Sequence, residues 1–467
     1  MNNIEDMSTE NNYIYTTFLS ISLLLIPLSF SLQVIYMQPF MALLPYFFLL
    51  VALLFILPIY NLNGMNHIFI NIPSYIYLFG IFVIFSQSFQ FVLGLISINE
   101  LVSSVLFLLL PMLFYLPFRF FVNRSNVNIF LFCIAIAGVI VSIFFIYDTI
   151  SKFIFREITP YAKQAFDYSI AQQGIVNLED VNRARISTLS RSHGLLQSHS
   201  VSSLWVMVGY FALMAVYNFK KVSLMFVTSI FFITLLVAMN FSSIIIFFLL
   251  SVFIYFEYFK ILFLRITSNN IIFIFFALIG AALLTSLILF NLENPLVKYF
   301  YNVATLQFSA LFGTGGVAIE NLSTGNGVSF SDMYAENITN YKQVLLQYPY
   351  AIITGTGFSS TMMGYGGDTG IIETVSKFSP GIFLIVLFAY LKVIYKSIIG
   401  VHIYKGSFES YQYKFIASIL LAVLIYEYHY SIWGLKNVLP LIFIALGMYD
   451  SLNSRNSNLK SKQRLMS

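Results

Sequence analysis

Long runs of apolar residues alternate with short polar turns along most of this chain, from residue 15 to residue 449. Each run is close to the ~20 residues that an α-helix needs to cross the hydrocarbon core of a bilayer. We predict spans at residues 15–35, 40–60, 74–97, 101–117, 128–147, 201–217, 222–238, 241–258, 271–291, 380–397, 415–430 and 437–450. The pattern therefore predicts an all-α fold, a polytopic membrane bundle of about twelve helices that forms one domain over residues 1–467.

Two long segments, residues 148–200 and 292–379, interrupt the alternation of spans and short turns. Connections in compact bundles are usually short, so segments of this length usually carry function. In the second segment, Asp332 is expected to cap a helix over about residues 333–347, and Pro349 is expected to end it. We therefore predict two large loops that contain short helices.

The positions of the basic residues indicate how the chain is oriented. Short cytoplasmic loops collect Lys and Arg, so the N-terminus is predicted to lie inside. The inside loops and the C-terminal tail then hold Arg119, Arg124, Lys220, Lys221, Lys260, Arg265, Lys392, Lys396, Lys405, Lys414, Arg455, Lys460, Lys462 and Arg464. Both long segments face outward in this topology. The net charge of +5 thus reflects topology and not a nucleic-acid partner.

The first long segment concentrates cationic side chains near the entry to a span. Arg183, Arg185 and Arg191 lie there, with His193 close behind. A planar guanidinium pairs with two phosphate oxygens at once, and a lipid-linked pyrophosphate is the anion expected at this depth. The alternative is that these arginines pair with neighbouring carboxylates or lipid headgroups, which applies least to Arg191 because it lies closest to the span. His193 could carry a proton or donate a hydrogen bond.

The second long segment holds a further cation, Lys342, and several carboxylates. The carboxylates that could accept a proton are Asp332, Glu336, Asp368 and Glu373. Asp368 lies in a stretch, residues 354–370, that is too rich in glycine for a helix, so no helix end requires its charge. It is the carboxylate we predict as a base. No arrangement of histidines and carboxylates has the spacing of a zinc site, so no metal is expected.

Three predictions concern single residues within or at the ends of spans. Glu427 and His429 lie near the outer end of a span, where an ionisable group is costly unless it faces the bundle interior. Both are therefore expected to face inward. Trp205 falls at a predicted outer interface, where amphipathic rings are common.

Four segments resemble, in their order along the chain, motifs of the bacterial O-antigen polymerases and of their relatives, the O-antigen ligases. Arg191-Ser-His-Gly194, followed by LLQSHSVSS, resembles an Arg-x-x-Gly segment that leads into a span, and MNFSSIIIF near Asn240 resembles a Ser-rich turn. NYKQVLLQYPYAIITGTGFSS resembles a helix, proline and Gly-x-Gly stretch. GGDTGIIETVSKFSPGIF resembles the polar residue and glycine before the next span. The similarity covers roughly residues 180–395.

The resemblance implies a GT-C-like membrane glycosyltransferase in the bacterial inner membrane, with its active site facing the periplasm. A polymerase of this family moves a growing glycan from undecaprenyl pyrophosphate onto a new lipid-linked repeat unit. The lipid carrier supplies the activated sugar, so no cofactor is expected. The implied partners are the undecaprenyl-pyrophosphate-linked oligosaccharide and membrane lipid, and a chain-length regulator protein is a candidate partner.

By position, Arg191 matches the family arginine that is expected to hold the pyrophosphate. The other residues that we predict at the substrate are Arg183, Arg185, His193, Lys342, Gly355, Gly357 and Glu373. Ligases carry a histidine after the Gly-x-Gly stretch, proposed as the base, whereas this chain has none between residues 292 and 379. Asp368 lies nearest that place.

Three other functions remain as alternatives and rank after a polymerase. An O-antigen ligase ranks second, and the missing histidine argues against it. The third is a lipid-linked oligosaccharide flippase, which has little use for an outer segment of this length and would carry charges deep in many spans. A sensor or scaffold is the last, and it predicts no cationic cluster near the membrane.

Overall fold

The structure is a computed structural model of the full chain. It describes residues 9–56, 72–122, 126–153, 155, 157–173, 194–196, 198–217, 228, 230–235, 243–251, 330–356, 370–429 and 437–466. The chain divides into two compact units, each of which is treated by itself. Unit 1 comprises residues 1–141, 204–229 and 334–467, and unit 2 comprises residues 142–203 and 230–333.

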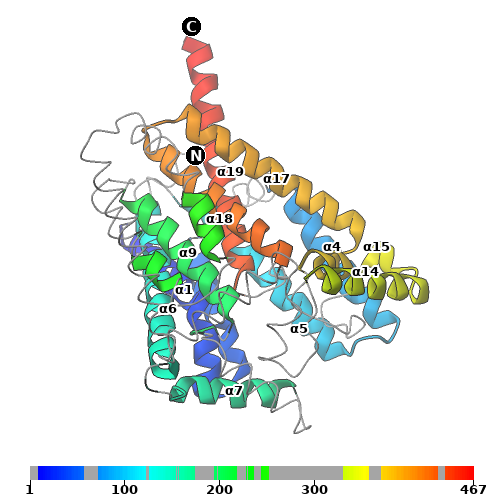
Figure 1. Ribbon diagram of the computed structural model, residues 1–467. Helices are drawn as coiled ribbons and strands as arrows, with labels where there is room; N and C mark the ends of the chain where they lie inside the picture. Colours follow the sequence, from blue (N-terminus) through cyan, green and yellow to red (C-terminus); the bar gives the residue numbers. More distant parts are fainter. Residues whose placement is uncertain are drawn as a thin grey trace, which may run out of the picture. The chain divides into compact units, whose positions relative to one another are not determined.

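The described part of the chain contains helices and no β-strand (Figure 1). Six of its helices are long and apolar enough to cross a membrane, at Asn12–Tyr36, Ser74–Val92, Ile98–Phe121, Val127–Lys152, Pro380–Ile403 and Phe408–Glu427. Pro39–Phe55 and Ser200–Val216 are shorter apolar helices. The chain is thus a helical protein with several membrane-spanning candidates, as the hydrophobic pattern predicts. The predicted span at residues 271–291 lies outside the described residues.

The chain of unit 1 begins with a helical hairpin. Helix α1, Thr9–Tyr36, turns through the short 3-10 helix η2, Pro39–Leu43, into α2, Leu44–Ile56. The Ser22 hydroxyl donates a hydrogen bond of 2.7 Å to the Pro45 carbonyl, which joins the two arms. This bond gives the buried hydroxyl the hydrogen-bond partner that it needs in an apolar environment.

A second pair of helices follows, α4 at Ser74–Val92 and α5 at Ile98–Leu109. Ser97 and Glu100 form a reciprocal capping box that fixes the start of α5. The chain then continues through a 3-10 turn, η4 at Leu110–Phe114, and a π-helical turn, η5 at Pro117–Phe121. Prolines at the start of both turns account for the departure from α-helical geometry.

Helix α6, Val127–Phe153, crosses α9, His199–Val216, at two glycines. A Cβ atom added to Gly138 would lie 2.5 Å from the Cα of Gly209. Trp205 of α9 is fully buried, and its indole N–H donates 3.1 Å to the Asn437 carbonyl. The ring thus lies inside unit 1, where its N–H finds a backbone partner, and its position at the membrane interface stays a prediction.

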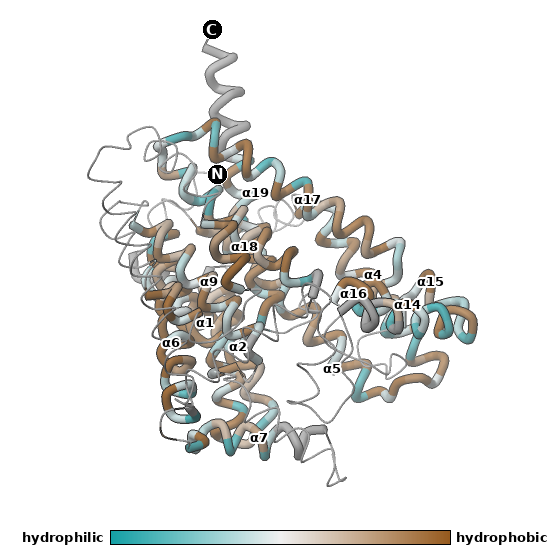
Figure 2. Tube along the Cα trace, viewed as in Figure 1, coloured by the Kyte–Doolittle hydropathy of each residue, from teal (hydrophilic) through white to brown (hydrophobic). Residues whose placement is uncertain are grey.

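The C-terminal part of unit 1 carries most of the second long segment that the structure describes. Its helices are α14 at Phe330–Gln347, α15 at Ala351–Thr354, α16 at Gly370–Phe378, α17 at Pro380–Ile403, α18 at Phe408–His429 and α19 at Leu439–Met466. Helices α17 and α18 pack together, and α19 packs on α18 and on η4 and η5. Hydrophobic residues cover most of α17, whereas hydrophilic residues gather on α14 (Figure 2).

The start of α14 differs from the prediction. The helix begins at Phe330, so Asp332 lies within its first turn and does not cap it. A carboxylate in the first turn is still favoured by the partial positive charge of the helix N-terminus, which explains why the residue type resembled a cap. The predicted end is confirmed, because the helix stops at Gln347, two residues before Pro349.

Candidate functional site

The Gly-x-Gly stretch begins where α15 ends, against one end of α4. The Ser86 hydroxyl donates 2.6 Å to the Thr354 carbonyl, and the Gln90 amide nitrogen donates 3.0 Å to the Gly355 carbonyl. All of these groups are buried in unit 1. Two polar side chains of a membrane-length helix thus bind the backbone of the second long segment.

Gly355 is held in a conformation and a space that only glycine fits. Its φ is +69°, and an added Cβ would lie 2.1 Å from the Lys377 carbonyl oxygen. The next residue, Thr356, donates its backbone N–H to the Ser376 carbonyl at 2.8 Å. Gly355 is therefore needed for a close contact between two backbone segments. Gly357, the second glycine of the stretch, lies outside the described residues.

Helix α16 falls in a region that the sequence analysis left without a helix. Glu373 and Lys377 form an ion pair along it, at the i,i+4 spacing that favours a helix. That spacing was the signal that could have revealed the helix. Glu373, predicted at the substrate, is half-buried and pairs with this lysine.

Glu427 joins α16 to α18 inside unit 1. It is 1% exposed, and the Thr374 hydroxyl donates a hydrogen bond to its carboxylate. The prediction that Glu427 faces the interior is confirmed. The side chain of His429 lies outside what the structure describes.

Lys342 lies on the exposed surface of α14. Within the described residues no carboxylate forms an ion pair with it, so its ammonium group is available to an anion. Two tyrosines follow at the end of the helix, with the rings of Tyr348 and Tyr350 5.9 Å apart. Burial, and to a smaller degree the neighbouring Tyr348, raises the pKa of Tyr350 above its usual value, so its hydroxyl stays protonated at neutral pH.

In unit 2, the turn of residues 194–196 is fixed from two sides. Gly194, the glycine of the Arg-x-x-Gly segment, has a φ of +62°, and an added Cβ would lie 2.9 Å from the Phe145 ring. Tyr161 of α7, Pro160–Gln173, donates its hydroxyl to the Leu195 carbonyl at 2.5 Å. These contacts position the chain three residues after Arg191.

The predicted site residues Arg183, Arg185, Arg191, His193 and Asp368 lie outside the described residues. Their proposed roles rest on the sequence.

A buried ion pair near the α6–α7 junction escaped the sequence analysis. Lys152 donates 3.0 Å to the Asp148 carboxylate, and the Thr159 hydroxyl donates 3.4 Å to the same group. All three residues are buried in unit 2. Burial of both charges is tolerable because each meets its counter-charge, and Thr159 adds a further donor. The pair fixes the start of α7 on the end of α6.

The close packing of Gly194 leads to a testable expectation. We expect Gly194→Ala to lower stability by about 1–3 kcal/mol, because the substitution adds backbone strain and a clash with Phe145. Thermal unfolding of the purified protein measures the change. Gly94 has a φ of +71° and no atom within 4 Å of an added Cβ, so Gly94→Ala isolates the backbone strain. Equal losses in the two variants would show that contact with Phe145 contributes nothing.

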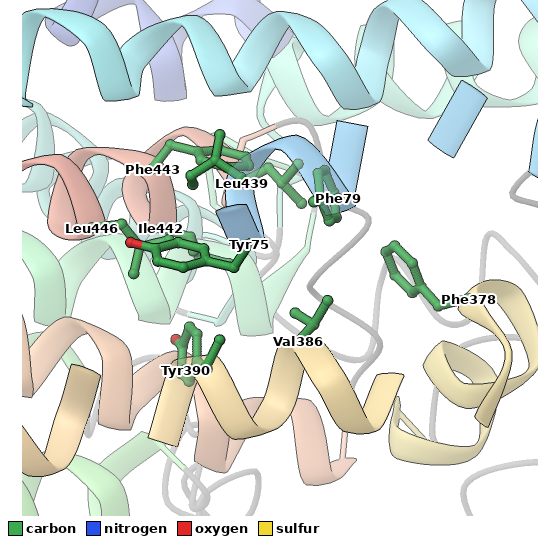
Figure 3. Close-up of a pocket in the computed structure, with 11 residues that line it drawn as sticks. Tyr75, Phe79, Phe378, Val386, Tyr390, Leu439, Ile442, Phe443 and Leu446 are labelled. Carbon is green, nitrogen blue, oxygen red and sulfur yellow. The ribbon is translucent and has the colours of Figure 1, made fainter. Parts of the chain in front are cut away.

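An apolar cavity of about 60 Å³ lies within unit 1 between α4, α16, α17 and α19 (Figure 3). Phe79 and Phe378 lie beside one another at one end of it, with ring centroids 5.9 Å apart. The hydroxyls of its two tyrosines are used elsewhere: Tyr75 donates to Asp450 and Tyr390 to the Leu420 carbonyl. The cavity therefore offers no polar group to a sugar or a phosphate.

The other end of α4 carries a separate polar cluster. Tyr75 and Tyr115 both donate to one carboxylate oxygen of Asp450, each at 2.8 Å. Arg119 donates to the Ser454 hydroxyl at 2.8 Å on the neighbouring turn of α19. The two ends of α4 are thus distinguished by the groups that hold them.

Over the described residues, the chain is a helical protein with six helices long and apolar enough to cross a membrane, and a long inter-helical segment is held by buried polar groups. No protein-family model matches the chain, and no curated protein or solved structure matches it either. Among the described residues, no cluster of three or more His, Cys, Asp or Glu side chains could hold a metal ion.

Proposed function

We propose that the chain is an O-antigen polymerase, a glycosyltransferase that joins undecaprenyl-pyrophosphate-linked oligosaccharide repeat units. It acts in the bacterial inner membrane with its active site on the periplasmic side. The long apolar helices support the membrane location. The order of the four motifs, with Arg191 in the first and the Gly-x-Gly stretch in the third, supports the family.

The observation that carries the proposal is the contact between two of these motifs. Gly355 of the Gly-x-Gly stretch lies against the carbonyl of Lys377, which belongs to the segment before the next span. Ser86 and Gln90 hold the same stretch against a membrane-length helix. Segments that resemble family motifs therefore meet where a loop enters the bundle, a position suited to a substrate that is anchored in lipid.

In the proposed reaction a hydroxyl of the new repeat unit attacks the anomeric carbon of the growing glycan. The bond from this carbon to the pyrophosphate oxygen breaks, and undecaprenyl pyrophosphate leaves with the electron pair. Arg191, with Arg183 and Arg185, stabilises the charge on the leaving group. Asp368 takes the proton of the attacking hydroxyl. Lys342 and the glycine turn belong to the acceptor side.

The test is the lipopolysaccharide ladder of a producing strain from which this gene has been deleted. A polymerase deletion leaves a single repeat unit on the lipid A-core, and the wild-type gene restores the long chains. Asp368→Asn should behave like the deletion, because the amide cannot accept the proton. Asp167, exposed on α7, is not among the residues assigned to the proposed site, so Asp167→Asn serves as the control and should restore the ladder.

Loss of even the single repeat unit from the deletion strain would instead indicate a ligase or a flippase. A ladder that is unchanged by the deletion would contradict all three functions.

A further inference from the structure

Helix α4 carries a layer of polar side chains on one face, at Ser86, Gln87 and Gln90. Their spacing, i, i+1 and i+4, places them on neighbouring positions of the helix surface. All three side chains are buried, and both glutamines are 0% exposed. The rest of the buried face of α4 is largely apolar, so this layer, which we call the amide layer, is a local exception that needs a cause.

Two residues of the amide layer donate hydrogen bonds to the second long segment. Ser86 binds the Thr354 carbonyl and Gln90 binds the Gly355 carbonyl. The bond from Gln90 also fixes the orientation of its amide, because only the nitrogen can donate to a carbonyl. Its oxygen is therefore the remaining free atom.

Three atoms of the amide layer have no hydrogen-bond partner among the described residues. They are the side-chain oxygen and nitrogen of Gln87 and the side-chain oxygen of Gln90. A buried amide without partners is strongly unfavourable, and a near-isosteric apolar residue such as methionine would avoid the penalty. An unpartnered amide that is buried at such a cost is expected to have a partner that is not among the described residues.

The free atoms define the chemistry of that partner. Two oxygens need donors, and one nitrogen needs an acceptor. A phosphate offers acceptors alone and would face two carbonyl-type oxygens, whereas an ammonium group offers donors alone. A sugar hydroxyl both donates and accepts, so adjacent hydroxyls of a glycan satisfy all three atoms.

We propose that Gln87 and Gln90 form a binding site for the hydroxyl groups of the acceptor sugar, an assignment that rests on the proposed polymerase function. The site adjoins the Gly-x-Gly stretch, because Gln90 binds Gly355 directly. Neither Gln87 nor Gln90 lines the apolar cavity, whose wall on α4 is formed by Tyr75, Ile76 and Phe79. The amide layer thus serves the sugar and has no part in binding the pyrophosphate.

The variant Gln87→Met tests this site, because methionine keeps the length of the side chain and removes the amide. We expect its melting temperature to rise by about 2 °C, since an unsatisfied buried group is removed. We expect acceptor kcat/KM to fall about tenfold, as for a lost pair of neutral hydrogen bonds. A lower melting temperature would show that Gln87 has a structural partner and would overturn the proposal.

A binding experiment separates this site from the proposed function. Saturation-transfer NMR on the purified full-length protein would use two probes: the repeat-unit oligosaccharide released by mild acid from the producing cells' polysaccharide, and inorganic pyrophosphate. Gln87→Met should weaken binding of the oligosaccharide about tenfold and leave that of pyrophosphate unchanged. Equal oligosaccharide binding by wild type and variant would show that Gln87 does not bind the sugar, and the site would be rejected.

Gln412, buried in α18, provides the matched control, because Gln412→Met removes the same amide from another membrane-length helix. It should leave both the ladder and oligosaccharide binding unchanged. If the wild-type gene restores the ladder and Gln87→Met does so equally well, the sugar site fails and the polymerase stands. If the wild-type gene does not restore the ladder, the polymerase fails while the binding comparison still decides the site.

Discussion

Arg191→Ala is expected to abolish long O-antigen chains while the protein still inserts into the membrane. The leaving pyrophosphate develops negative charge as the glycosidic bond breaks, and a guanidinium stabilises that charge through two parallel hydrogen bonds. Loss of one such group from a preorganised site lowers the turnover rate by about 10²–10³-fold. The measurement is the lipopolysaccharide ladder in the deletion strain, with membrane levels of the protein followed by immunoblot.

The control for this substitution removes a cation from the same long segment. Lys163 lies exposed on α7 and is not among the residues predicted to bind the pyrophosphate, so Lys163→Ala lowers the local positive charge and leaves those residues in place. Its ladder should match that of the wild type. Arg191→Lys should restore little activity, since a point charge cannot reproduce the bidentate geometry. A full ladder from Arg191→Ala would refute the pyrophosphate assignment.

Gly355→Ala is expected to have the second large effect, this time on folding. An added Cβ would lie 2.1 Å from the Lys377 carbonyl oxygen, so one of the two backbone segments would have to move. The movement would also disturb the hydrogen bonds from Ser86 and Gln90. We expect a loss of about 3 kcal/mol or more, measured as a lower melting temperature and a smaller monodisperse fraction in detergent.

Two other glycines separate the causes of this loss. Gly406 has a φ of +77° and no atom within 4 Å of an added Cβ, so Gly406→Ala reports the backbone strain alone. Gly381 has neither a positive φ nor a close neighbour, and Gly381→Ala should leave stability unchanged. If Gly355→Ala and Gly406→Ala have the same loss of melting temperature, the contact with Lys377 contributes nothing to stability.

The six long apolar helices were predictable because a bilayer imposes the same length and composition on each helix that crosses it. The inward orientation of Glu427 followed from the same physics, since a carboxylate that faces lipid is costly. The end of α14 was also predictable, because Pro349 disfavours helical geometry at the residue directly before it.

What the sequence could not supply are contacts between residues far apart in the chain. The need for glycine at residue 355 arises from the Lys377 carbonyl, and no local pattern marks that approach. The burial of Trp205 depends in the same way on a crossing of two glycines from different helices. Helix α16 was not predicted because the glycines before it favoured a loop, and the single i,i+4 pair of Glu373 and Lys377 was a weaker signal for a helix.

The two polar clusters on α4 have a consequence for movement. Tyr75 fastens one end of the helix to Asp450, and Ser86 and Gln90 fasten the other to residues 354–355. A shift of α4 along its axis would break all three hydrogen bonds in surroundings where water cannot replace them. Carriers that work by alternating access rely on helices that slide or rock past one another, whereas a helix pinned at both ends suits a stationary frame. Under the proposed function, the lipid-linked substrate would then come to this part of the protein by diffusion within the bilayer.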